Sequence, residues 1–360
     1  MKDRKLNSTV GKERFLALDA VRGVAALAVL VLHLSSGILP HRGYLAVDVF
    51  FVLSGFVIAH AYESRLLAGL SVGKFALLRA IRLYPLVQVG ILISVSINVA
   101  LQLSGHSHLS FSFAQVVFGA LLLPYITAAS VDMYLVLSPT WSLFNELVIN
   151  VLYSAVAKVL SNRFLVICCA SAAMILFPAT LLNGSIEFGP YRGTLLMGLV
   201  RTIFSFSYGV LIYRFRSKRV MEHGLLPLSM ILATTIALFA VGDVGGLNGL
   251  YDALAVTLVI PAVIAVTAHV RISGLFAKAA ALLGDLSYPV YILHWPLRLA
   301  LFATGMQTRL PEAVFLSASA VIICLFAWVV TRLYDEPARK LLQRKLVRGA
   351  TLPTHPVTVP

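Results

Sequence analysis

Apolar runs of helix length alternate with short polar segments along the chain, and this pattern predicts a protein that crosses a membrane many times. A helix needs about 17 to 25 predominantly apolar residues to span the hydrocarbon core of a bilayer. Runs that meet or approach this length lie at residues 16–36, 44–62, 84–104, 143–160, 164–182, 193–213, 225–241, 251–270, 280–304 and 313–333. We therefore expect an all-α fold, a polytopic integral membrane bundle with ten transmembrane helices.

One further apolar run, residues 113–127, is short for a crossing. If it does not cross, the basic loops all fall on one side of the membrane, at residues 65–82, 158–163, 214–219, 271–278 and 332–348. Lys and Arg are enriched in cytoplasmic loops. We therefore expect residues 113–127 to form a re-entrant or interfacial segment, and both chain ends to be cytoplasmic.

The domain organisation that follows is a single membrane domain at residues 15–340. Residues 1–14 are basic and polar, and we expect them to form a cytoplasmic tail. Residues 341–360 are expected to form a second cytoplasmic tail, which is disordered.

Composition agrees with this interpretation and excludes several classes of protein. Of 360 residues, 59% are hydrophobic and only 12% are charged, which is far from the composition of a soluble domain. The net charge of +14 is concentrated in the loops, where cytoplasmic placement explains it, so we expect no nucleic-acid partner. Three cysteines, Cys168, Cys169 and Cys324, lie inside apolar runs without the spacing of metal ligands, and no metal site is expected.

The first apolar run carries three ionisable residues, Asp19, Arg22 and His33. Such groups are costly in lipid and therefore indicate a functional site. On a helix, a spacing of three or of eleven residues returns to the same face, so all three side chains can point into one groove. At 1.5 Å per residue that groove would extend roughly 16 to 21 Å along the helix axis, which is long enough for an extended substrate.

Six sequence motifs occur in a characteristic order. They are LDAVRGVAALAVLVLH, GYLAVDVFFVLSGFVIAH, RAIRLYP, PTWSLFNELVINVLY, LGDLSYPVYILHWPL and YDEPARK. In this order they resemble the membrane acyltransferase-three family, bacterial O-acyltransferases that modify sugars and glycans, over about residues 15–340.

The resemblance implies an activity and its partners. An acyl group, usually acetyl, would pass from acetyl-coenzyme A in the cytoplasm to a hydroxyl of a carbohydrate or glycan acceptor, either free or lipid-linked. Acyl-CoA would be a co-substrate, so no bound cofactor is expected. The location would be the bacterial inner membrane, in contact with its lipids. The residues themselves leave the acceptor and the acyl chain open.

His33 is the predicted catalytic base. Transfer to an alcohol needs a group that removes the hydroxyl proton, and an imidazole is suited to this near neutral pH. His33 matches the histidine that the family uses for catalysis; the alternative is a helix-end histidine bonded to a backbone carbonyl. We expect Glu146 to orient His33, because the topology places both near the outer half of their helices. Glu146 could instead be solvated at the headgroups, and Asp48 and Asp19 are rival acids.

The donor end should be basic, because coenzyme A carries phosphates. Arg79 and Arg82 are three residues apart, and RAIR matches the two-arginine element of the family. Ordinary cytoplasmic loop charge also accounts for these two arginines, but it does not account for Arg22, which can bind a phosphate or pair with Asp19.

Further residues are candidates for binding the acceptor or supporting the site. Trp141, Ser142 and Asn145 flank Glu146 and can bind an acceptor, although Trp141 alone would more often be an interfacial anchor. His294, close to Tyr288, is a second candidate base or else a packed histidine.

The combined prediction is an O-acyltransferase that transfers the acyl group directly within one groove. The alternative is a membrane carrier for an acyl donor, a lipid-linked sugar or an anion, because buried charges along a helix suit a carrier equally well. A scaffold or sensor would leave Arg22 and His33 unexplained.

Overall fold

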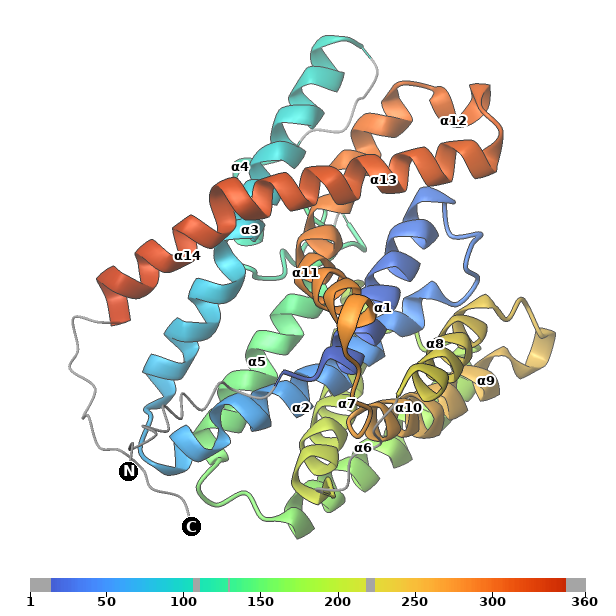
Figure 1. The fold of residues 1–360 in the computed structure, drawn as a ribbon. Coiled ribbons are helices and arrows are strands. Elements are labelled where there is room, and N and C mark those ends of the chain that lie inside the picture. The colour runs from blue at the N-terminus through green and yellow to red at the C-terminus, as the bar shows by residue number, and fades with distance from the viewer. Residues whose placement is uncertain (1–13, 106–110, 129, 218–223, 348–360) are drawn as a thin grey trace, which may run out of the picture.

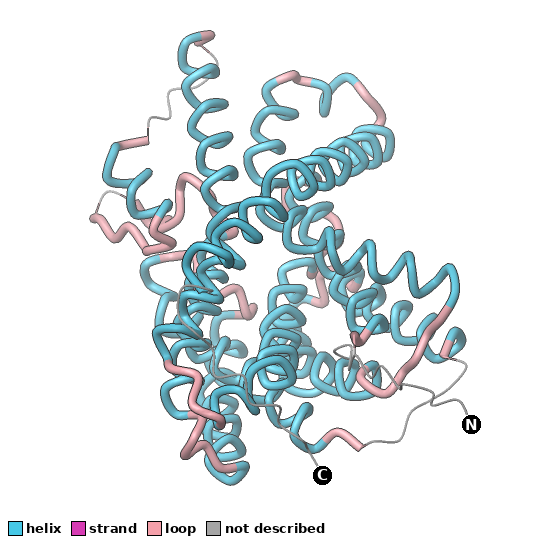
Figure 2. Tube along the Cα trace, turned by 60° about the vertical axis from the view of Figure 1, so that its left-hand side comes forward, coloured by secondary structure: helices cyan, strands magenta, loops and turns pink. Residues whose placement is uncertain are grey.

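The computed structural model describes all residues except 1–13, 106–110, 129, 218–223 and 348–360. The described residues form helices joined by loops, the longest of which lies between α4 and α5, and their only β-structure is two isolated bridges (Figures 1 and 2). Seven helical segments are long and apolar enough to cross a membrane by length and composition. The predicted all-α, multi-pass membrane fold is confirmed.

The centre of the bundle is built from two closely packed helix pairs. Helix α1 (Leu16–Leu34) packs along α11 (Gly274–Ala303), and α2 (Ala46–Leu67) packs along α7 (Leu195–Phe215). Gly55 of α2 and Gly209 of α7 make the second approach possible, because a Cβ at either position would overlap the backbone of the facing helix. Small residues at such contacts are typical of helix packing in membranes.

The remaining helices surround these two pairs (Figure 1). They are α3 (Val72–Leu103), α4 (Phe113–Ala120), α5 (Thr140–Val156), α6 (Asn162–Asn183), α8 (Leu225–Ala240), α9 (Asn248–Leu254), α10 (Ile260–Thr267), α12 (Met306–Arg309), α13 (Glu312–Val330) and α14 (Glu336–Leu342). Helical turns at Ala255–Val259 and Thr331–Asp335 join α9 to α10 and α13 to α14, so that α13 and α14 form one long rod across the bundle (Figure 1).

Helical segments coincide with all ten predicted spans, and seven of them have the length and hydropathy of a crossing. The others are α5 and α8, which have 17 and 16 residues, and α11. The short run at residues 113–127 forms only the eight-residue helix α4, which at 1.5 Å per residue is too short to cross. The number of crossings therefore remains a prediction.

Two helix boundaries differ by more than six residues from those predicted. The third run was expected to begin at residue 84, after a basic loop, but α3 begins at Val72, where the Ser71 side chain caps the helix by accepting a hydrogen bond from the Lys74 amide. Arg79 and Arg82 consequently lie inside a helix. At the other terminus the helix continues through Gln343–Val347, beyond residue 340. Residues 348–360 lie outside the described part of the chain.

Contacts between helices fix their relative directions. Arg22 contacts Gly284, and Arg298 contacts His33, so α1 and α11 run in the same direction. Asp48 contacts Arg201 near the other end of the bundle from Arg22, and α2 therefore returns toward the start of α1. We call the two ends of the bundle the Arg22 end and the His33 end.

Candidate functional site

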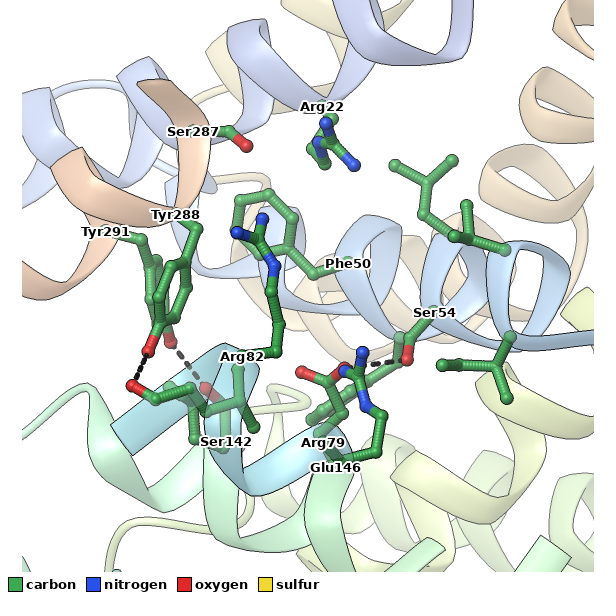
Figure 3. A pocket seen from close by; sticks show the side chains of 16 residues that line it. Arg22, Phe50, Ser54, Arg79, Arg82, Ser142, Glu146, Ser287, Tyr288 and Tyr291 are labelled. Atoms are coloured by element: carbon green, nitrogen blue, oxygen red, sulfur yellow. Dashed lines mark hydrogen bonds and ion pairs between the residues drawn. The ribbon is translucent and has the colours of Figure 1, made fainter. Parts of the chain in front are cut away.

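Two cavities lie between the central helices. The smaller, the arginine cavity, has a volume of about 220 Å³ and is lined by polar groups that include Arg22, Ser54, Arg79, Arg82, Ser142, Glu146, Ser287, Tyr288 and Tyr291 (Figure 3). The larger, the histidine cavity, has a volume of about 580 Å³, and its polar and aromatic lining includes His33, His41, Tyr44, Asp132, Tyr134, Trp141, Glu187, Arg201, Tyr291, Trp295 and Arg298. The predicted groove is therefore divided into two cavities, and Tyr291 is the only described residue that lines both.

Glu146 lies in the arginine cavity, held by two neighbouring helices. Its Oε1 atom accepts a hydrogen bond from Arg79 Nη2 at 2.7 Å and another from Ser54 Oγ at 2.9 Å (Figure 3). The expectation that Glu146 orients His33 is wrong, because Glu146 pairs with Arg79 and His33 lines the other cavity. Helix α3 begins earlier than predicted and so brings Arg79 to the level of Glu146.

Asp19 and Arg22 form the ion pair that their spacing predicts. Arg22 Nη2 lies 2.6 Å from Asp19 Oδ1 and donates a second bond to the Gly284 carbonyl at 2.9 Å. The other carboxylate oxygen of Asp19 accepts from Arg14 Nε at 2.6 Å. Both carboxylate oxygens of Asp19 are thus paired with arginines at the Arg22 end, and Asp19 is not a partner for His33.

Arg82 differs from the other two arginines of this cavity. Among the described residues it forms neither a hydrogen bond nor an ion pair, and its guanidinium lies over the ring of Tyr288 at 5.5 Å. The Tyr288 hydroxyl is engaged elsewhere, because it donates to the Leu83 carbonyl at 2.6 Å. Arg82 also interacts electrostatically with Asp335, which itself pairs with Arg339 at 2.6 Å, so Arg82 adds a positive charge to the wall of the cavity.

His33 lies at the other end of α1 with one ring nitrogen bound to backbone. Its Nδ1 atom is 2.8 Å from the Val29 carbonyl, which can only accept, so Nδ1 carries the proton and Nε2 keeps its lone pair. The two interpretations of His33 offered by the sequence, a catalytic base and a histidine bonded to backbone, are therefore compatible, because they use different ring nitrogens. Arg298 Nε donates a hydrogen bond to the His33 carbonyl at 2.6 Å. This carbonyl lies at the C-terminal end of α1, where a positive charge interacts favourably with the helix dipole.

His294, the second candidate base, lines neither cavity. It is fully buried, with Nδ1 at 3.1 Å from the Val290 carbonyl and an Nε2 that has no hydrogen-bond partner within the described chain. Its ring lies 4.9 Å from that of His33 and 6.1 Å from that of Tyr291. His294 therefore packs between these two side chains.

Asp48, the other rival acid, forms an ion pair with an arginine that the sequence analysis did not identify. Arg201 of α7 donates from Nε to Asp48 Oδ1 at 2.8 Å, and its Nη2 pairs with Oδ2. Both side chains are buried, and Arg201 lines the histidine cavity. Arg201 and Arg298 are single arginines within apolar runs, so the criterion that identified Arg22 would have found both.

The three candidate residues at positions 141, 142 and 145, at the start of α5, do not share one cavity. Trp141 lines the histidine cavity, where the Arg201 guanidinium lies 5.8 Å from its ring. Ser142 lines the arginine cavity, and its Oγ lies 2.7 Å from the Tyr291 hydroxyl. Asn145 is buried and lines neither cavity, and its amide has no partner among the described residues.

Comparisons with known proteins agree with the motifs. A family model for an acyltransferase domain, acyltransferase-3, matches residues 15–332. A protein of Rhizobium radiobacter described as "Protein 2 in picA locus" is 38% identical over 183 residues, which cover 46% of this chain and 95% of that protein. No solved structure matches the chain. The matched segment contains both cavities and nearly every described helix, and we conclude that this chain is a multi-pass membrane acyltransferase belonging to the acyltransferase-3 family.

Proposed function

We propose that this protein transfers an acyl group, foremost acetyl, from acyl-CoA to a hydroxyl of a carbohydrate or glycan acceptor, with His33 as the general base. One observation carries the proposal: a cavity lined by three arginines and a cavity lined by His33 share one residue of the described chain, Tyr291. Two substrates of different chemistry can thus approach one point from two ends of the bundle.

The arginine cavity suits the donor. Guanidinium groups bind phosphate oxygens in a bidentate manner, and coenzyme A carries several phosphates. Arg82 supplies a cation that forms no hydrogen bond or ion pair with a described carboxylate, and Arg22 and Arg79 are held in place by Asp19 and Glu146. This end is also the one that the basic loops predict to be cytoplasmic, where the acyl-CoA donor is expected.

The histidine cavity suits the acceptor. It has more than twice the volume of the arginine cavity, and Trp141, Trp295, Asp132 and Glu187 combine aromatic faces with carboxylates. A sugar has apolar ring faces and many hydroxyls, so a pocket of this mixed character can fix its orientation.

The atoms and the proton of this reaction balance with His33 and the two substrates. His33 Nε2 accepts the proton of the acceptor hydroxyl while that oxygen attacks the thioester carbonyl carbon. The carbon–sulfur bond then breaks, and the thiolate of coenzyme A leaves and takes the proton back from Nε2. The products are an ester on the acceptor and free coenzyme A. Direct transfer is favoured over an acyl-enzyme because the two candidate bases, His33 and His294, have their printed hydrogen bonds to backbone carbonyls and not to a serine or cysteine.

The test is acyl transfer in inverted membrane vesicles supplied with extracted cell glycans and acetyl-CoA labelled in the acetyl group. We expect label in the glycan fraction with the intact chain, none with His33→Ala, and a raised donor requirement with Arg79→Ala combined with Arg82→Ala. Label that accumulates inside vesicles without entering glycan would favour the carrier. Equal labelling by His33→Ala would refute the assignment of the base.

A further inference from the structure

Tyr291 forms the boundary between the two cavities. It is the one described residue that lines both of them, so at this point the wall between the arginine cavity and the histidine cavity is a single side chain thick. The side chain is 7% exposed and lies in the middle of α11, one helical turn before His294.

Contacts on both sides hold the Tyr291 ring in this position. Ser142 Oγ donates to the Pro139 carbonyl at 3.0 Å and lies 2.7 Å from the Tyr291 hydroxyl, which can therefore donate its own proton to Ser142 (Figure 3). The ring of Phe50, which lines the arginine cavity, packs edge-on against Tyr291 with 5.3 Å between centroids. The Tyr291 side chain is thus held by hydrogen bonds to Ser142 and to the Pro139 carbonyl, the latter at 3.4 Å, and by ring contacts with Phe50 and His294.

The proposed reaction requires this boundary to be crossed. The ester bond forms only when the acyl carbon, carried by a donor in the arginine cavity, reaches an oxygen deprotonated by His33 in the histidine cavity. We propose that Tyr291 is a specificity-determining residue, whose ring limits the size of the acyl group that can pass between the cavities. This inference rests on the proposed function.

Acyl length is the property that this arrangement controls. An acetyl group extends one methyl beyond its carbonyl carbon, whereas a butyryl or octanoyl chain would have to share the crossing with the Tyr291 ring. Selection by a closed apolar wall can reach about tenfold or more for each added methylene. The intact protein is therefore expected to prefer acetyl-CoA.

The experiment compares acetyl-, butyryl- and octanoyl-CoA as donors for the intact chain, Tyr291→Ala and Tyr291→Phe, with transfer to the glycan fraction as the readout. Tyr291→Ala removes the ring and should raise the butyryl-to-acetyl rate ratio by about tenfold or more. Tyr291→Phe keeps the ring and should leave this ratio within about twofold of the intact value. Tyr153→Ala is the control, because Tyr153 is a buried tyrosine of α5 that lines neither cavity.

Each outcome decides the proposal. A rise in the ratio with Tyr291→Ala but not with Tyr153→Ala supports it, and an unchanged ratio in folded Tyr291→Ala overturns it. If Tyr291→Ala does not fold, Phe50→Ala removes the ring that supports Tyr291 from the donor side and should shift the ratio in the same direction; no shift then overturns the proposal. If the intact chain transfers no acyl group from any donor, the proposed function itself fails, whereas transfer with an unmoved ratio refutes only the role of Tyr291.

Discussion

Arg79 and Glu146 form an ion pair of 2.7 Å across the arginine cavity, and Ser54 adds a third helix to the same carboxylate oxygen. Together with Ser54, the pair links α3, α5 and α2 at the wall of the cavity where the donor is proposed to bind. Glu146 therefore acts on the charge and direction of Arg79, and it has no contact with His33 in the described structure.

Glu146→Gln is predicted to strengthen donor binding. Glutamine has nearly the shape of glutamate but no charge, so Arg79 would lose its counter-charge and become available to a phosphate. We expect the KM for acetyl-CoA to fall by about threefold to tenfold, equivalent to about 0.7 to 1.4 kcal/mol, while the pH dependence of kcat stays unchanged. Steady-state kinetics over a range of pH would measure both.

The matched control is Glu63→Gln. Glu63 pairs with Arg214 at 2.6 Å between α2 and α7 and lines neither cavity. This variant should leave the donor KM unchanged. A fall in kcat with Glu146→Gln at an unaltered KM would instead restore Glu146 to a role in the chemical step.

Arg82→Gln is predicted to weaken donor binding without affecting the chemical step. Hydrogen bonds to charged groups contribute about 1.5 to 3 kcal/mol, so the donor KM should rise by roughly tenfold to a hundredfold at unchanged kcat. Arg82→Lys keeps the charge but loses the planar fork, and it should recover part of the loss. Arg332→Gln, which removes an exposed arginine paired with Glu336, should bind the donor normally.

Removing one partner of the buried Asp48–Arg201 pair is predicted to destabilise the protein strongly. Asp48→Asn or Arg201→Met leaves the other charge buried without compensation, at a cost of about 3 to 5 kcal/mol. The combined Asp48→Leu and Arg201→Met change removes both charges and should be less destabilising than either single change. Thermal unfolding in detergent measures this, and additive losses in the double variant would contradict the pairing.

His33→Gln is predicted to lower the rate of acyl transfer but to leave binding of the donor intact. General base catalysis contributes about a hundredfold to ten-thousandfold, so the rate should fall by that factor. Stabilisation of the protein by coenzyme A against thermal unfolding should persist, because His33 does not line the arginine cavity. His294→Gln should lower the rate of transfer much less. A larger loss of rate from His294→Gln than from His33→Gln would instead identify His294 as the base.

The sequence by itself determined the elements of this protein and most of its reactive side chains. Apolar runs predict helices because a membrane requires every backbone hydrogen bond to be made locally, and the helices follow the ten predicted runs closely. Isolated ionisable residues in those runs identify Arg22 and His33, and the Asp19–Arg22 pair follows from a spacing of three residues within one helix.

Only the tertiary structure decided which charges meet and how the groove is divided. Glu146 and Arg79 are 67 residues apart and Asp48 and Arg201 are 153 residues apart, so no local periodicity relates the members of either pair. Depth along a helix places Glu146 and His33 in similar halves of their expected spans, but the packing of α5 against α3 and α2 puts Glu146 in the arginine cavity, whereas His33 lines the other one. Tyr291 likewise becomes the boundary only because α11, α5 and α2 bring it against Ser142 and Phe50.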